Sequence, residues 1–247
     1  MRARLATGLL MVLAALSTVA EAQDQASESD RFTDGLIAGD YVRLTGGLIS
    51  PLHPRGNLAD WNRGRSYGLA WENWQSGSGG VGRVGFSLGV NYGLLPFDEG
   101  HFLGDFVAPD GARATSATAS DASVLEIETG VRLRIPAPFI LPSFSLGFGY
   151  INIRPSTIHY ISPSVTGTTG EQHRYGGEIT LGAGLDKQVI DRFAVFGEAA
   201  YTYGFTGLGQ GFAQAGGTCA TSANGCDPLK NTMFTTIRGG LRVRVGR

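Results

Sequence analysis

The sequence predicts an all-β protein, an eight-stranded antiparallel up-and-down transmembrane β-barrel. Three observations predict this fold: segments in which apolar and polar residues alternate, connections that alternate between short and long, and 38 glycines in 247 residues. Alternation with a period of two is the strand period, because successive side chains of a strand point to opposite faces of a sheet. Glycine at about twice its usual frequency, with strand formers and aromatic residues still plentiful, indicates many turns rather than disorder.

The N-terminal segment is typical of a secretory signal peptide. Two arginines in residues 1–4 precede an almost wholly apolar run, and a small-x-small cleavage pattern ends at Ala22. We expect a signal peptide over residues 1–22, cleavage between Ala22 and Gln23, a leader over 23–39 and a barrel over 40–247. A membrane-anchoring helix is the alternative for the first segment. Elsewhere no stretch approaches the roughly 18 uninterrupted apolar residues that a spanning helix needs, so a membrane-embedded body must use strands.

The alternation is most regular over residues 123–135. Glu126, Glu128, Arg132 and Arg134 fall on one face of this expected strand, and apolar residues and one threonine fall on the other. A soluble β-sandwich would turn the charged face to water, whereas a membrane barrel would turn it to a polar lumen. The eight expected strands are residues 41–49, 66–75, 81–94, 123–135, 143–153, 175–185, 193–205 and 232–245.

The lengths of the connections favour the barrel over the sandwich. Three connections are expected to be short turns: residues 75–80, 136–142 and 186–192. The other four are long and rich in Gly, Pro, Ser, Thr and Asn: residues 50–65, 95–122, 154–174 and 206–231. Short turns at one end and long loops at the other are typical of outer-membrane barrels.

Charged residues gather on the face that the barrel would turn inward. The predicted lumen charge network comprises Arg43, Glu72, Arg83, Glu126, Glu128, Arg132, Arg134, Glu178, Glu198, Arg238, Arg242 and Arg244. The opposite face carries almost no charge in mid-strand, where an arginine facing lipid would cost roughly 2–4 kcal/mol. The chain also prefers Arg to Lys: its two lysines, Lys187 and Lys230, fall in expected turns or loops. The planar guanidinium suits bidentate pairing with Glu in a narrow interior.

Aromatic residues cluster toward the ends of the expected strands. We interpret them as girdles at the two membrane interfaces, with ordinary hydrophobic packing as the alternative. They are Tyr41, Trp61, Tyr67, Trp71, Trp74, Tyr92, Phe97, Tyr150, Phe193, Tyr201 and Tyr203.

With these features the chain resembles the small eight-stranded outer-membrane barrels of the OmpA and OmpX type. The resemblance covers residues 40–247 and depends on the signal peptide, the strand number, the sorting of the loops and the Arg/Glu interior. It implies a monomer in the outer membrane of a Gram-negative-type bacterium, in contact with membrane lipid and lipopolysaccharide. Such barrels usually end in an aromatic residue, whereas this chain ends in arginine, at Arg247.

Two functions are compatible with this barrel. Eight strands enclose an interior that side chains just fill, so we expect Arg–Glu pairs to plug the lumen. The protein would then have a structural or cell-surface interaction role, with any extracellular ligand bound by the long loops. The alternative is a narrow, porin-like, anion-preferring channel, gated by Arg238 as it exchanges between Glu198 and Glu128.

No catalytic or metal-binding motif stands out, and we expect neither an enzyme nor a cofactor. His159 and Ser162 resemble superficially the His and Ser of lipid A deacylases, but residues three apart do not share a strand face. All histidines, namely His53, His101, His159 and His173, are expected to be solvated. The nearest approach to a metal site, residues 98–101 (Asp-Glu-Gly-His), is weak. The net charge of −1 gives no reason to expect a nucleic-acid partner.

The two cysteines lie close together in a polar, loop-like stretch of an exported chain. We expect a disulfide between Cys219 and Cys226, with free thiols as the alternative.

Overall fold

The structure is a computed structural model, and it describes residues 38–52, 58, 60–76, 82–137, 139–169, 173–190, 192–208 and 229–245. The expected signal peptide, its cleavage site, nearly all of the leader, His53 and both cysteines lie outside these residues. In the described part of the chain, no helix is long and apolar enough to cross a membrane.

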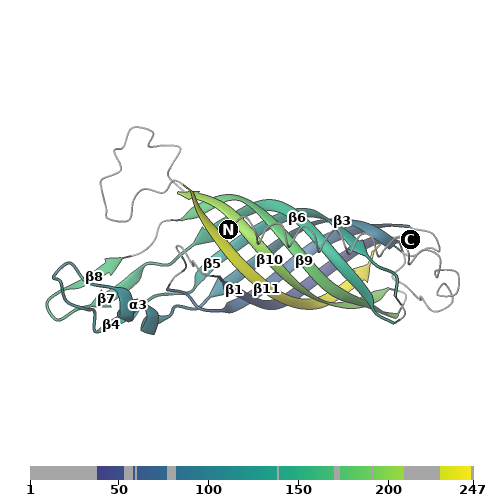
Figure 1. Ribbon diagram of the computed structural model, residues 1–247. Helices are drawn as coiled ribbons and strands as arrows, with labels where there is room; N and C mark the ends of the chain where they lie inside the picture. Colours follow the sequence, from purple (N-terminus) through teal and green to yellow (C-terminus); the bar gives the residue numbers. More distant parts are fainter. Residues whose placement is uncertain are drawn as a thin grey trace, which may run out of the picture.

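Eight long strands close into one antiparallel barrel (Figure 1). They are β1 (Gly39–Pro51), β2 (Gly64–Ser76), β3 (Gly82–Leu95), β5 (Ala122–Arg134), β6 (Leu141–Arg154), β9 (Arg174–Ile190), β10 (Phe193–Leu208) and β11 (Leu229–Arg244). Their order around the barrel is β1-β11-β10-β9-β6-β5-β3-β2, so each strand pairs with its neighbours along the chain and β11 returns to β1. The predicted eight-stranded antiparallel up-and-down barrel is therefore confirmed.

One expected connection is wrong. Residues 186–192 were expected to form the short turn between the sixth and seventh strands, but β9 continues through Asp186, Lys187 and Gln188 to Ile190. Pairing with β10 extends the strand: Asp186 lies opposite Phe196 and Lys187 opposite Val195. Asp186 therefore points into the barrel and is buried, whereas Lys187 points outward and is exposed.

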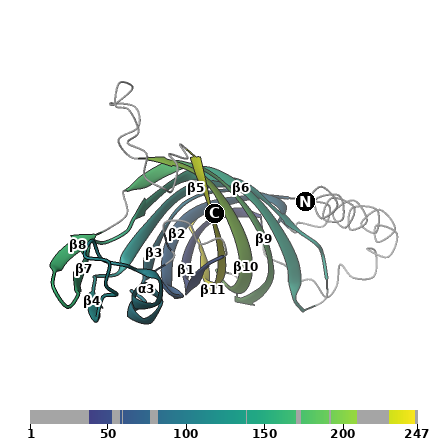
Figure 2. The same cartoon turned by 60° about the vertical axis from the view of Figure 1, so that its left-hand side comes forward.

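The barrel has two different ends. We call the end with the connections β2–β3, β5–β6 and β9–β10 the turn end, and the opposite end the loop end. Two of the expected long loops contain regular structure at the loop end: α3 (Glu99–Asp105), β4 (Ser116–Thr118), β7 (Ile158–Ile161) and β8 (Thr166–Thr169). The short strands form a second sheet in the order β4-β7-β8, and Figures 1 and 2 show it beyond the barrel together with α3. We call residues 96–121 and 155–169 the cap.

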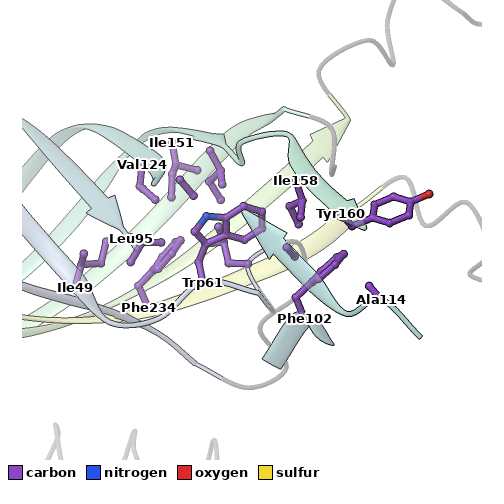
Figure 3. Packing of buried hydrophobic residues seen from close by; sticks show 14 of the residues in the cluster. Ile49, Trp61, Leu95, Phe102, Ala114, Val124, Ile151, Ile158, Tyr160 and Phe234 are labelled. Carbon is purple, nitrogen blue, oxygen red and sulfur yellow. The ribbon is translucent and has the colours of Figure 1, made fainter. Parts of the chain in front are cut away.

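A hydrophobic cluster joins the cap to the barrel (Figure 3). Trp61 is fully buried in it, and a chain of ring contacts leads from Trp61 through Phe97, Phe102 and Phe106 to Tyr160. The barrel contributes inward residues from the loop-end parts of its strands: Ile49, Leu95, Val124, Ile151, Ile153 and Phe234. Apolar packing therefore covers the loop end of the interior.

A smaller apolar cluster lies at the turn end. Tyr41, Trp74, Leu141 and Ala194 pack together there and are at most 4% exposed. The expectation that Tyr41, Trp61 and Trp74 belong to interfacial girdles is therefore wrong. Tyr41 and Trp74 stand on the inward parity of their strands, and Trp61 is drawn into the cluster of the cap.

The outer wall of the barrel is apolar. Its outward side chains are large and well exposed, as in Leu69 (55%), Phe148 (51%) and Ile237 (66%). A soluble protein seldom exposes such a continuous band, whereas a membrane barrel presents one to lipid.

Candidate functional site in the barrel interior

A layer of paired charges fills the middle and the turn end of the interior. It comprises Arg43, Glu72, Arg132, Arg134, Asp186, Glu198, Arg238 and Arg242, each at most 6% exposed. We call it the paired layer. Its residues come from six of the eight barrel strands, because every strand turns alternate side chains to the axis.

Glu72 is the acceptor around which the paired layer is built. Its Oε1 lies 3.1 Å from Arg43 Nε and 3.3 Å from Arg132 Nε. Its Oε2 accepts hydrogen bonds from Arg242 Nε at 2.7 Å and from Trp74 Nε1 at 3.0 Å. Three guanidinium groups thus share one carboxylate, which is fully buried.

Glu198 and Asp186 complete the pairing. Glu198 Oε1 accepts a hydrogen bond from Arg238 Nε at 2.7 Å, and its Oε2 pairs with Arg132 and lies 3.7 Å from Arg43 Nη1. Asp186 bridges two arginines: Arg134 Nε donates to it at 3.0 Å, and Arg242 Nη1 donates to its other oxygen. Sequence reasoning missed Asp186 because it assigned the residue to a turn.

Aromatic rings flank the same arginines. The guanidinium carbon of Arg134 lies 3.2 Å from the ring centroid of Trp74, and that of Arg242 lies 4.2 Å from the ring of Phe196. Such stacking suits a weakly hydrated guanidinium in a dry interior. It also links the paired layer to the apolar cluster at the turn end, to which Trp74 belongs.

Three other predicted network residues form a separate group nearer the loop end. Glu126, Glu128 and Glu178 are inward and at most 6% exposed; we call them the acidic group. In the described part of the chain none of them has an arginine, lysine or histidine nitrogen within 4 Å. One oxygen of Glu126 and both oxygens of Glu178 are buried without a hydrogen-bond partner.

Glycines make room for the acidic group. Gly149 lies opposite Glu128 on one side and Glu178 on the other. A Cβ atom at Gly149 would stand 2.2 Å from the backbone carbonyl oxygen of Ile127 and 2.8 Å from Glu178 Oε1, and one at Gly147 would stand 2.4 Å from Glu128 Oε1. At Gly149 the neighbouring backbone therefore requires glycine, and at Gly147 a larger residue would displace the Glu128 carboxylate.

Three arginines stand apart from both groups. Arg83 and Arg244, predicted as network members, are half-buried at the turn end, and the Nε atom of each is buried without a hydrogen-bond partner. Arg174, which sequence reasoning missed, is inward and buried at the loop end, with Nε and Nη1 unpartnered. Its inward position follows from the parity of β9 once that strand is extended to residue 174.

The polar residues of the cap are used in structural contacts. Asp98 caps α3 by accepting from the backbone N–H of His101 at 3.0 Å, and Glu99 accepts from the N–H of Ala117 at 3.0 Å. His101 Nδ1 lies 3.0 Å from Asp60, so His101 is not the solvated residue that we expected. The described residues contain no group of three His, Cys, Asp or Glu side chains able to hold a metal ion.

The pair His159 and Ser162 does not form a catalytic contact. His159 is exposed on β7, whereas the Ser162 hydroxyl is buried and donates to Asp110 at 2.7 Å. Hydrogen bonds from Ser164, from Ser162 and from the backbone N–H of Ala112 lower the pKa of Asp110 to about 2. Asp110 and the two serines thus tie the two halves of the cap together.

No protein-family model matches this chain, and no curated protein matches it. Solved structures with a similar shape are bacterial outer-membrane proteins. Neisserial surface protein A is 8% identical, with a TM-score of 0.46 over 84% of this chain and 98% of that one. A major outer membrane protein of Thermus thermophilus is 11% identical, with a TM-score of 0.46 over 83% and 99%. The outer membrane enzyme PagL is 14% identical, with a TM-score of 0.37 over 84% and 100%. At this similarity the likeness concerns the barrel fold alone.

Proposed function

We propose that this protein is a monomeric barrel of the bacterial outer membrane with a plugged lumen and a structural or cell-surface interaction role. The apolar outer wall supports the membrane placement, because outward charges in mid-strand would be costly in lipid. The loop end then faces the outside of the cell and the turn end the periplasm, which is the usual arrangement of such barrels. Lipid and lipopolysaccharide are the expected surroundings.

The order of the packed layers along the barrel axis is the main support for a plugged lumen. The paired layer lies between the apolar cluster of Tyr41 and Trp74 at the turn end and the cluster around Trp61 at the loop end. A hydrated ion entering from either side would first meet apolar packing, and would then have to separate buried ion pairs. Removing one partner of such a pair typically costs about 3–5 kcal/mol. A resting barrel built in this way should not conduct.

The cap supports a role at the cell surface. Its helix and short strands pack on a hydrophobic core, so it offers a defined surface rather than a set of free loops. Defined surface segments held by a rigid scaffold are the usual carriers of binding functions. We propose that an extracellular ligand binds to the cap, and that the barrel interior is not catalytic.

Single-channel current across a planar bilayer tests the plug. Refolded mature protein, with its barrel verified by heat-modifiable gel mobility, is expected to give no discrete steps at any applied voltage. Protease treatment of intact cells tests the orientation, and cleavage is expected only in the cap and the other connections of the loop end. Regular conductance steps in the wild-type protein would overturn the plug.

A gated channel is the second candidate, and the position of Arg238 favours it. Arg238 pairs with Glu198, while the acidic group toward the loop end has oxygens without partners. Arg238 therefore has alternative acceptors in Glu126 and Glu128, and a shift between them would separate it from the paired layer. If this candidate is right, the wild-type barrel conducts and the Arg238→Gln variant carries a different current. Equal currents in the two proteins would exclude this gate.

A further inference from the structure

The outer wall of the barrel is hollowed across β9, β10 and β11. The hollow has a volume of about 520 Å³ and is lined by outward residues of the three strands: Leu181, Ala183, Ala199, Tyr201, Thr235 and Ile237. Its floor lies at Ala183 and Ala199, which are register partners on β9 and β10. These methyl groups stand among much larger neighbours, so the lipid-facing wall is deepest there.

The hollow continues toward the turn end. The next outward residues on β10 and β11 are Gly197 and Gly239, which lie opposite each other. No atom lies within 4 Å of the place where a Cβ of Gly197 would stand. We call the hollow and its continuation at these two glycines the furrow.

Cationic side chains lie at the turn end of the furrow. Lys187 points outward from β9 four residues beyond Ala183, about 13 Å away at the usual strand rise of about 3.3 Å per residue. It is exposed between Leu185 (54%) and Val189 (59%), on an otherwise apolar stretch of β9. Arg192 is exposed in the β9–β10 turn, and its carbonyl accepts from the N–H of Arg244 at 2.9 Å. A lysine in this setting extends its ammonium group to the membrane interface, where lipid phosphates lie.

We propose that the furrow holds one acyl chain of an anionic phospholipid of the periplasmic leaflet, whose phosphate group is bound by Lys187 and Arg192. The spacing fits this lipid. The apolar band of such barrels is about 25 Å tall, and the hollow begins about 13 Å from Lys187, so an acyl chain whose phosphate group lies at Lys187 reaches the hollow near the middle of the band. The inference rests on the membrane placement proposed above.

A second copy of the chain fits the furrow less well. A two-fold dimer joins identical patches, so it would set one furrow against another and leave a larger gap between the two walls. An acyl chain is flexible and fills a shallow depression without needing a matching surface. The positive charge at one end also has its complement in a phosphate group.

Retention of phospholipid by the folded barrel tests the proposal. Mature protein is folded into vesicles of phosphatidylethanolamine and phosphatidylglycerol in equal parts, extracted in a mild detergent and weighed by native mass spectrometry. We expect the wild-type barrel to retain one phosphatidylglycerol. Lys187→Glu should lower this retention at least about fivefold, since one cation near the headgroups is worth about 1 kcal/mol and the new carboxylate repels the phosphate group. Ala199→Trp, which fills the furrow, should lower retention of both lipids.

Matched substitutions elsewhere on the outer wall serve as controls. Arg65→Glu reverses an outward charge at the loop end, and Thr129→Trp adds a large side chain to the outward face of β5. Both should retain lipid as the wild type does. Equal retention by Lys187→Glu and Arg65→Glu, with all barrels folded, would overturn the lipid site. A dimer that Ala199→Trp abolishes would also overturn it, in favour of a second copy. Failure of the wild type to fold into vesicles would instead overturn the membrane placement.

Discussion

The paired layer and the acidic group are built from the same kind of inward strand position but have opposite surroundings. In the paired layer Glu72 has three arginines and a tryptophan N–H around one carboxylate. In the acidic group both oxygens of Glu178 are buried without a partner. Burial is nearly equal, 0% exposed for Glu72 and 3% for Glu178.

The difference shows that parity places a charge inside the barrel but does not pair it. Arginines concentrate toward the turn end and the middle, so carboxylates at that depth are compensated. The acidic group lies nearer the loop end than the paired layer does, and its neighbours include glycines. The hydrophobic cluster around Trp61 lies beyond it along the barrel axis. Burying a polar group without a partner lowers the free energy of unfolding. Removing one partner of a buried ion pair lowers it by several kcal/mol, because the other partner is then left uncompensated.

Glu72→Gln gives the largest expected effect. The amide keeps the size of the side chain but removes the charge that compensates Arg43, Arg132 and Arg242. We expect the free energy of unfolding to fall by about 3–5 kcal/mol, the usual cost of breaking a buried pair. Urea unfolding of the barrel in vesicles, followed by gel mobility, measures it. A loss below about 1 kcal/mol would mean that the paired layer is not held by Glu72.

Trp61→Ala tests the apolar cover that separates the acidic group from the outside. Trp61 is fully buried in the cluster that joins cap and barrel, and truncating such a residue typically costs about 3–5 kcal/mol. We expect the cap to be cleaved by protease at a much lower concentration while the barrel keeps its heat-modifiable mobility. Ile161→Ala, at an exposed position of β7, is the control and should not alter cleavage.

Glu178→Gln is the counterpart of Glu72→Gln in the acidic group. It breaks no ion pair that the described residues contain, and it replaces a buried carboxyl group whose two oxygens have no hydrogen-bond partner. Because no partner is lost, we expect the free energy of unfolding to stay the same or to rise by about 1 kcal/mol. The same urea experiment measures it. A loss as large as that of Glu72→Gln would remove the distinction between the two groups.

Asp110 shows how hydrogen-bond partners alone stabilise a carboxylate, because it is exposed to solvent but accepts several hydrogen bonds. Its pKa of about 2 lies below the ordinary value of 3.8, so these hydrogen bonds favour the folded cap above about pH 4. The contribution is lost as the pH falls from about 4 through 2. The protection of the Ala112 amide, measured as its exchange rate relative to that of an unstructured peptide at the same pH, should therefore fall over that range in the wild type, and Asp110→Asn should abolish this pH dependence. Equal dependence in both proteins would contradict it.

The cap was the part of the fold that the sequence predicted least well. Residues 95–122 and 154–174 were expected to be loops, yet they contain α3, β4, β7 and β8. These elements are short and carry no long alternation of their own. Packing of Phe102 and Tyr160 in the cluster around Trp61, rather than local periodicity, holds them together.

The sequence by itself determined how many strands form the barrel and, within each alternating segment, which residues face inward. A strand alternates strictly, so every predicted inward Arg and Glu has its direction fixed by parity. Only the tertiary structure decided which charges meet. Arg242 and Glu72 are 170 residues apart along the chain, and they pair because β11 closes onto β1 beside β2. Asp186 joins them because cross-strand pairing with β10 extends β9 through a polar stretch, and that pairing is a property of two strands together.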